Sequence, residues 1–89
     1  MNVEAIYFGE LRDLTHLNQE SISLNEGSNL RDLIDNLTTT YGHDFHLCLF
    51  HKNRYSILIN GQNYEVLDGE KTVLKEGDEV VFLEITMGG

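Results

Sequence analysis

The most distinctive chemical group in this sequence is a carboxyl group carried by a pair of glycines, Gly88 and Gly89, which follow an apolar segment. At about 7% per position, glycine would fill both places by chance in roughly 0.5% of chains. An α-carboxyl group titrates at about 3.5, so at neutral pH it is a carboxylate and a poor electrophile. It can carry another group only after activation, for example as a mixed anhydride with AMP. Two residues without β-carbons form a thin tip that can enter a narrow channel. We therefore interpret the tail as a substrate arm, with a frayed end as the alternative.

Four side chains that can bind zinc lie close together in the sequence: His43, His46, Cys48 and His51. Their spacing does not place all four on one face of a helix or a strand. They are interleaved with apolar residues that need burial, namely Phe45, Leu47, Leu49 and Phe50. We therefore expect a partly packed connecting segment across these residues, 43–51, and no metal site. Cys48, flanked by leucines, is interpreted as a small buried hydrophobe rather than a reactive thiol.

Acidic residues dominate the charge of the chain. Six Lys and Arg against fifteen Asp and Glu give a formal net charge of −9. This balance disfavours nucleic acid, which needs cations to replace phosphate counterions, and it disfavours an anionic membrane surface. The acids of residues 65–89 could steer the chain onto a basic partner, or they could simply be solvated. Glu76, Asp78 and Glu79 are explained by a turn ahead of a strand, without a role in acid–base catalysis or calcium binding.

The elements that must position the tail follow from hydrophobic patterning. Residues 3–8 and 20–24 are predicted to be strands, joined by a polar loop over residues 10–18. A helix with Asn29 as N-cap follows, and it ends at Gly42. Its buried stripe has helical spacing and consists of Leu30, Leu33, Ile34 and Leu37.

The second half of the chain is predicted to return to strands. Residues 56–59 form a central strand, the turn Asn60-Gly61 follows, and residues 63–66 form a short edge strand. Residues 80–85 form the last strand. The order predicts an α+β fold in which one helix covers one face of a four- or five-stranded mixed sheet. The strands at 3–8 and 80–85 should be central and parallel neighbours.

Length and cysteine content limit the cellular setting. A chain of 89 residues suits a single domain, residues 1–89, with a flexible C-terminal tail at 86–89. The apolar runs are too short to span a bilayer, and the first residues lack the pattern of a secretory signal. Cys48 is the only cysteine, so no internal disulfide can form. We therefore expect a cytoplasmic protein.

Four segments, in this order and spacing, carry a resemblance to a known family. They are YFGELRDL at 7–14, NEGSNLRDL at 25–33, LIN at 58–60, and LKEGDEVVF at 74–82 followed by GG at 88–89. The chain resembles the β-grasp, ubiquitin-like sulfur carriers of the MoaD/ThiS type. The LRD segment is most similar to the small subunit of molybdopterin synthase. Many members have prolines where this chain has Glu84 and Ile85, and this departure leaves the receiving pathway open.

The resemblance implies a mechanism and a set of partners. An E1-like adenylating enzyme with MgATP would activate Gly89, and a persulfide donor would displace AMP to leave a thiocarboxylate. The large subunit of molybdopterin synthase would then take the sulfur. The chain itself would bind no cofactor and supply no catalytic side chain, and Gly88 would allow the thin approach. We expect apolar partner contacts from a set of which some members must be core: Phe82, Leu83, Ile85 and Met87.

Several alternatives remain at this level. The chain could be a ubiquitin-like modifier that is joined through Gly89 to target lysines. It could also be a carrier for thiamine, cysteine or tRNA thiolation, or a β-grasp binding module whose glycine pair is accidental. Extending the chain by one residue would separate the last alternative from the others, because only a binding module would tolerate it.

Overall fold

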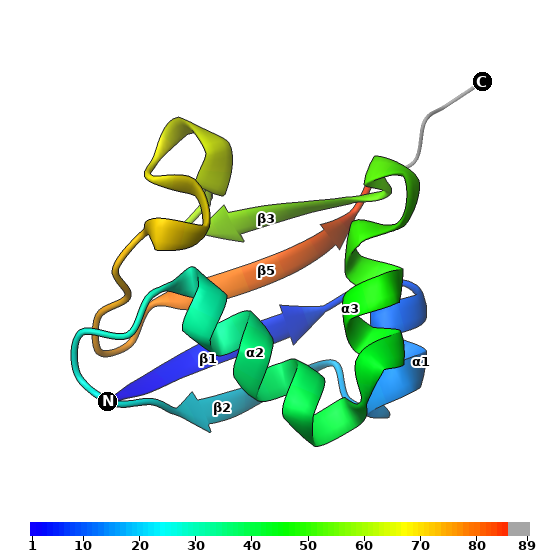
Figure 1. Ribbon diagram of the computed structural model, residues 1–89, viewed down its shortest axis with the longest axis horizontal. Coiled ribbons are helices and arrows are strands. Elements are labelled where there is room, and N and C mark those ends of the chain that lie inside the picture. Colours follow the sequence, from blue (N-terminus) through cyan, green and yellow to red (C-terminus); the bar gives the residue numbers. More distant parts are fainter. Residues whose placement is uncertain (86–89) are drawn as a thin grey trace.

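The structure is a computed structural model that describes residues 1–85. A five-stranded mixed sheet forms its framework (Figure 1). The strands are β1 (Asn2–Tyr7), β2 (Gln19–Ser23), β3 (Tyr55–Ile59), β4 (Gln62–Asn63) and β5 (Glu79–Glu84), in the spatial order β2-β1-β5-β3-β4. β1 and β5 are parallel, and the other neighbouring pairs are antiparallel. The predicted α+β architecture with a central parallel pair is therefore confirmed.

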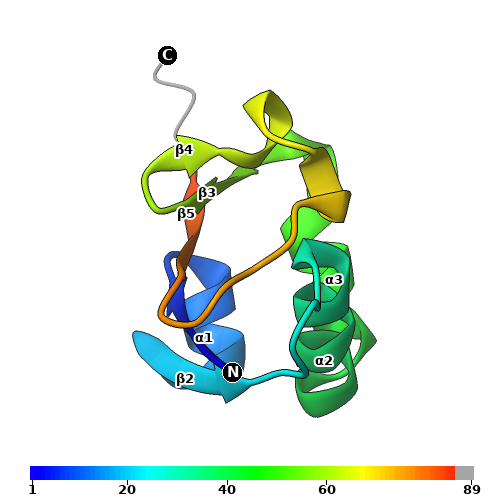
Figure 2. The ribbon, with the colours of Figure 1, turned by 90° about the vertical axis from the view of Figure 1, so that its left-hand side faces the viewer.

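Alternation along the strands places the core on one face of the sheet. Val3, Ala5 and Tyr7 of β1 are buried, as are Val80 and Phe82 of β5. Helices α2 (Leu30–Tyr41) and α3 (His43–Phe50) cover this face, while α1 (Glu10–Thr15) lies at the end of β1 (Figures 1 and 2). The opposite face of the sheet is free of helices in the described part of the chain.

Helix α2 forms where the sequence predicts it. Asn29 accepts a hydrogen bond from the Asp32 backbone N–H at 2.9 Å, and the Asp32 carboxylate accepts one from the Asn29 N–H at 2.9 Å. This reciprocal capping box satisfies two backbone donors that a helix start leaves free. The four predicted stripe residues are all buried, and the helix ends at Gly42, whose φ of 95° favours glycine.

Two helices were not predicted from the sequence. The predicted polar loop at 10–18 contains α1, which starts after Gly9 and ends at His16, both with positive φ. Its six residues are too few to show a helical period, although Leu11 is completely buried. The segment at 43–51, expected to be a partly packed connection, forms α3 and the start of a 3-10 turn over His51–Asn53.

The predicted edge strand at 63–66 is displaced toward the turn. β4 covers only Gln62–Asn63, and residues Tyr64–Val66 form a 3-10 helix. The Asn63 side chain accepts the Glu65 backbone N–H at 2.8 Å, which favours the turn over continued pairing. Within residues 1–85, none of the helices combines the length and apolar character that crossing a bilayer requires.

Candidate functional site

The candidate site is the surface around the end of β5, where residues 86–89 begin. The register pairs Tyr55 of β3 with Glu84 of β5. One residue further on, the Ile85 backbone N–H donates to the Arg54 carbonyl at 2.6 Å. The antiparallel pairing therefore holds the chain up to Ile85. Ile85, the last residue that the structure describes, is therefore held beside the turn that follows α3.

Tyr55 joins three elements at this position. Its hydroxyl donates to the Phe8 carbonyl at 2.8 Å and accepts the Leu11 N–H at 3.2 Å, and the Glu84 carboxylate lies 3.4 Å away. Burial is the main cause that raises the pKa of Tyr55 to about 12, so it remains a neutral donor at physiological pH. The start of α1 is thereby attached to the ends of β3 and β5.

Gly9 allows this close approach. Its φ is +60°, and a Cβ atom there would lie 2.2 Å from Oε2 of Glu84 and 2.9 Å from the Tyr55 hydroxyl. Both the backbone conformation and the space therefore require glycine. The LRD segment, which we take as residues 7–14, and the end of β5 are far apart in sequence, and they meet at Gly9.

The helix-free face of the sheet presents apolar side chains beside the tail. Ile6, Leu58 and Val81 are half-buried and lie in one row, because Val81 pairs with both Ile6 and Leu58. Leu83, two residues further along β5, extends this apolar surface along the strand toward Ile85, which is 41% exposed. We call these five residues the outer apolar patch. Its composition suits contact with another protein.

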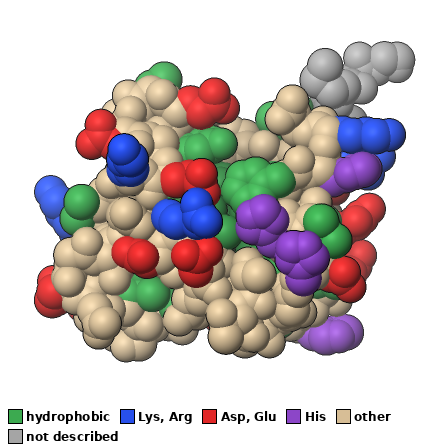
Figure 3. Space-filling view, viewed as in Figure 1, with side chains coloured by type: hydrophobic (Ala, Val, Ile, Leu, Met, Phe, Trp, Pro, Cys, Tyr) green, Lys and Arg blue, Asp and Glu red, His purple; other side chains and the backbone are tan. Residues whose placement is uncertain are grey.

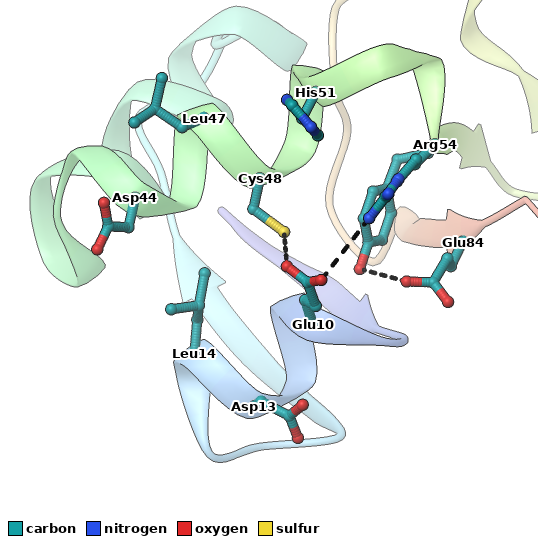
Figure 4. Close-up of a pocket in the computed structure, with 10 residues that line it drawn as sticks. Glu10, Asp13, Leu14, Asp44, Leu47, Cys48, His51, Arg54 and Glu84 are labelled. Atoms are coloured by element: carbon teal, nitrogen blue, oxygen red, sulfur yellow. Dashed lines mark hydrogen bonds and ion pairs between the residues drawn. The ribbon is translucent and has the colours of Figure 1, made fainter.

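A pocket of about 470 Å³ opens between α1 and α3 (Figure 4). Glu84, at the end of β5, is one of the residues that line it. Cys48 of α3 and Glu10 of α1 face each other across it, with Sγ 3.6 Å from Oε2. Burial, followed by the charge of Glu10, raises the pKa of Cys48 to about 11. The thiol is therefore protonated at neutral pH and a weak nucleophile. Arg54 lies 3.8 Å from Glu10.

The predicted partner-binding residues fall into three groups. Phe82 is completely buried, so it is one of the core members that the prediction allowed for. Leu83 and Ile85 reach the surface in the outer apolar patch. The predictions for Met87, Gly88 and Gly89 lie outside the described residues.

The histidine and cysteine segment folds as a helix with two inward residues, Phe45 and Leu49. Leu47 and Phe50 are 53% and 39% exposed, contrary to the expectation that they need burial. Cys48 is only partly buried, which corrects its prediction as a buried hydrophobe; it adjoins Leu49 on the helix and lies at the boundary of the core. Across residues 1–85, no three His, Cys, Asp or Glu side chains are arranged to hold a metal ion.

The acids at 76–79 have the contacts of a turn. Asp78 accepts the Lys75 N–H at 2.8 Å and the Asn60 side-chain amide at 2.9 Å. Asn60 also accepts the Glu79 N–H at 2.9 Å, which ties the β3–β4 turn to the start of β5. These contacts stabilise the strand that leads to the tail.

The sequence analysis missed the roles of Gly9, Tyr55 and Arg54. The LRD segment drew attention to residues 7–14, but its partners are about 45 positions away in the chain. Among the local signals, only the glycine directly after a strand could have indicated a close backbone approach.

Comparison with known proteins decides the family. The sequence model of the ThiS family matches residues 5–89, nearly the whole chain. The chain belongs to the ThiS family. It is 26% identical, over all 89 residues and the full length of both proteins, to a molybdopterin synthase sulfur carrier subunit from Chlamydomonas reinhardtii. It is a ubiquitin-like sulfur carrier of the ThiS/MoaD type.

Solved structures agree with the fold of this ThiS-family chain. Small archaeal modifier protein 1 from Methanosarcina acetivorans superimposes with a TM-score of 0.81 at 28% identity, covering 99% of this chain and 96% of that one. CysO from Mycobacterium tuberculosis gives a TM-score of 0.75 at 23% identity, covering 94% and 99%. At that lower identity the similarity to CysO concerns the β-grasp fold alone. These differently named relatives share one architecture, so the architecture does not select a pathway.

Proposed function

We propose that this chain carries sulfur as a thiocarboxylate on Gly89 and serves as the small subunit of molybdopterin synthase. The observation that supports this most directly is its full-length similarity to the Chlamydomonas sulfur carrier subunit. The glycine pair supplies the carboxylate that the chemistry needs. With a single cysteine and no means of forming an internal disulfide, the chain suits the reducing cytoplasm.

The proposed chemistry that forms the thiocarboxylate has three steps, all on partner enzymes. On an E1-like adenylating enzyme, a Gly89 carboxylate oxygen attacks the α-phosphorus of MgATP, and pyrophosphate leaves. The terminal sulfur of a persulfide donor then attacks the acyl carbon, and AMP leaves. A second thiol cleaves the resulting acyl disulfide, giving the thiocarboxylate and an ordinary disulfide. The large synthase subunit would receive the sulfur.

The folded part contributes position rather than reactivity. Pairing of Tyr55 with Glu84 fixes the origin of the tail. Four further residues span at most about 14 Å, enough to place the last carbonyl inside a partner's active site. The outer apolar patch, which continues to Ile85, would dock the partner while the tip enters.

A second candidate function is that of a protein modifier. The 28% identity to the Methanosarcina modifier protein favours it. In that case the amine of a target lysine, rather than a persulfide, would attack the adenylated Gly89 and release AMP. A carrier for thiamine, cysteine or tRNA thiolation would differ only in the enzyme that receives the sulfur.

Intact mass spectrometry tests these assignments. The protein is incubated with ATP, an E1-like enzyme and a persulfide donor, and a version with one extra C-terminal residue serves as control. Replacement of one oxygen by sulfur at Gly89, only in the unextended protein, supports a carrier; conjugates on lysines support a modifier. If neither product forms while a known carrier reacts under the same conditions, the proposal fails.

Kinetics of the same reaction test the docking surface. Ile85→Asp should raise the KM for the carrier in adenylation, because it places a charge in the outer apolar patch. Val66→Asp is the matched control, since Val66 is 76% exposed and lies in the 3-10 helix after β4. An equal KM for both variants would remove the patch from the proposal.

A further inference from the structure

The pocket between α1 and α3 takes no part in the chemistry proposed for the tail. Its lining includes the apolar side chains of Leu14 and Leu47 and the Tyr55 ring, together with Glu84 at the end of β5. We propose that it receives an arginine or lysine side chain from a basic segment of the adenylating enzyme. The identity of that partner rests on the proposed function; the preference for a cation does not.

The charges around the pocket favour a cation. Four carboxylates line it, from Glu10, Asp13, Asp44 and Glu84, against Arg54 and His51. Glu10 is paired with Arg54 at 3.8 Å. Among residues 1–85, Asp13 and Asp44 have neither an ion pair nor a side-chain hydrogen bond, so their charges are available to a ligand. Figure 3 shows acidic side chains gathered along the edge of the molecule formed by α1 and α3.

The apolar lining residues suit the stem of such a side chain. Arginine and lysine bury their methylene groups against apolar surface while the charged end remains among acids. Leu47, 53% exposed on α3, and Leu14 on α1 offer this surface from the two sides of the pocket (Figure 4). The neutral thiol of Cys48 adds polarizable surface without adding charge.

The position of the pocket points to a partner that handles the tail. Glu84 belongs to the pocket, and the next residue, Ile85, belongs to the outer apolar patch. The two surfaces therefore flank the origin of residues 86–89. The chain's own tail is a poor occupant, because residues 86–89, Thr-Met-Gly-Gly, contain no cation. A second copy is disfavoured by the net charge of −9.

The preference for a cation is tested by NMR titration of the intact protein with acetyl-Arg-Leu-amide. Amides of α1 and α3 should shift saturably, and acetyl-Glu-Leu-amide should not shift them. The double variant Asp13→Lys/Asp44→Lys should weaken binding by about five- to tenfold, as expected for reversed exposed charges. Asp68→Lys is the control, because Asp68 directly precedes the 3-10 helix Gly69–Lys71 and is not among the residues that line the pocket. Equal shifts with both peptides, or no shifts, overturn the proposal.

Adenylation kinetics then test the partner. The same double variant and Leu47→Ser, which removes an exposed apolar group, should raise the KM for the carrier with little change in kcat. Asp68→Lys should match the wild type. If the peptide binds but these variants keep a normal KM, the assignment to the adenylating enzyme is wrong. If the wild type itself is not adenylated, the proposed function fails, and the cation preference is decided by the titration alone. Pocket shifts that depend on protein concentration would indicate a second copy and contradict the proposal.

Discussion

Replacing Gly9 with alanine tests the contact between the LRD segment and the end of β5. Gly9 has φ 60° and ψ −137°, a region that residues with a Cβ rarely adopt, which costs about 1–3 kcal/mol. The new Cβ would also lie 2.2 Å from Oε2 of Glu84. Moving Glu84 and Tyr55 aside would weaken a hydrogen-bonded group by roughly another 1 kcal/mol. We expect a total loss of about 2–4 kcal/mol in the free energy of unfolding.

Gly27→Ala is the matched control for this measurement. Gly27 has φ +86° but no atoms within 4 Å of the position its Cβ would take. It should therefore show only the backbone cost, about 1 kcal/mol. Urea denaturation followed by circular dichroism measures both variants. With a slope of about 1 kcal/mol/M, the extra loss at Gly9 should lower the midpoint by at least 1 M relative to Gly27→Ala.

A double variant isolates the contact from the backbone strain. Glu84→Ala removes the carboxylate that the new Cβ would meet. Gly9→Ala should therefore cost less in the Glu84→Ala background than in the wild type. If Gly9→Ala costs no more than Gly27→Ala, or if Glu84→Ala gives no relief, the close packing at the origin of the tail is refuted.

Three further predictions concern side chains whose pKa is raised by burial and a nearby carboxylate. Glu10→Gln should lower the pKa of Cys48 below about 11 but leave it above the ordinary 9.0, because burial is the larger cause. The pH at half-maximal iodoacetamide alkylation measures this, and an unchanged or higher value contradicts it. Because the unfolded chain releases the thiol proton first, Cys48 should also make stability fall between about pH 9 and 11. Tyr41→Phe should cost about 1–2 kcal/mol, since the Tyr41 hydroxyl donates to the Glu20 carboxylate; urea midpoints equal to wild type would refute it.

The sequence predicted those elements whose signal is local and repeated. Helix α2 has a capping residue, four apolar residues at helical spacing and a glycine at its end, and each acts over a few positions. The strands of the central pair are short runs of branched and aromatic residues. Strands that pair in parallel are usually buried and therefore have near-continuous apolar sequences. The apolar character of these two strands was thus enough to predict that they are parallel neighbours in the interior of the sheet.

The contacts missing from the sequence prediction are long-range or depend on very few residues. Helix α1 has six residues and buries only Leu11 and Thr15, so no period can be detected. The hydrogen bonds of Tyr55 join residues about 45 positions apart, and no local pattern encodes them. The pocket is formed when α1 and α3 pack together, so it could not be predicted from a sequence in which neither helix was recognised.

In the proposed chemistry the reacting atoms belong to the main chain of Gly89, so partner selection must depend on the surfaces beside the tail. Ile85→Asp perturbs one of these surfaces and Leu47→Ser the other. If both contact the adenylating enzyme in one complex, each variant should raise the KM for adenylation, and their effects should multiply in the double variant, as expected for separate contacts. If the pocket instead serves the enzyme that receives the sulfur, Leu47→Ser should leave adenylation unchanged and slow only sulfur transfer from preformed thiocarboxylate. Measuring both steps for the single and double variants separates these cases. A pocket variant that is normal in both steps would exclude the pocket from partner selection.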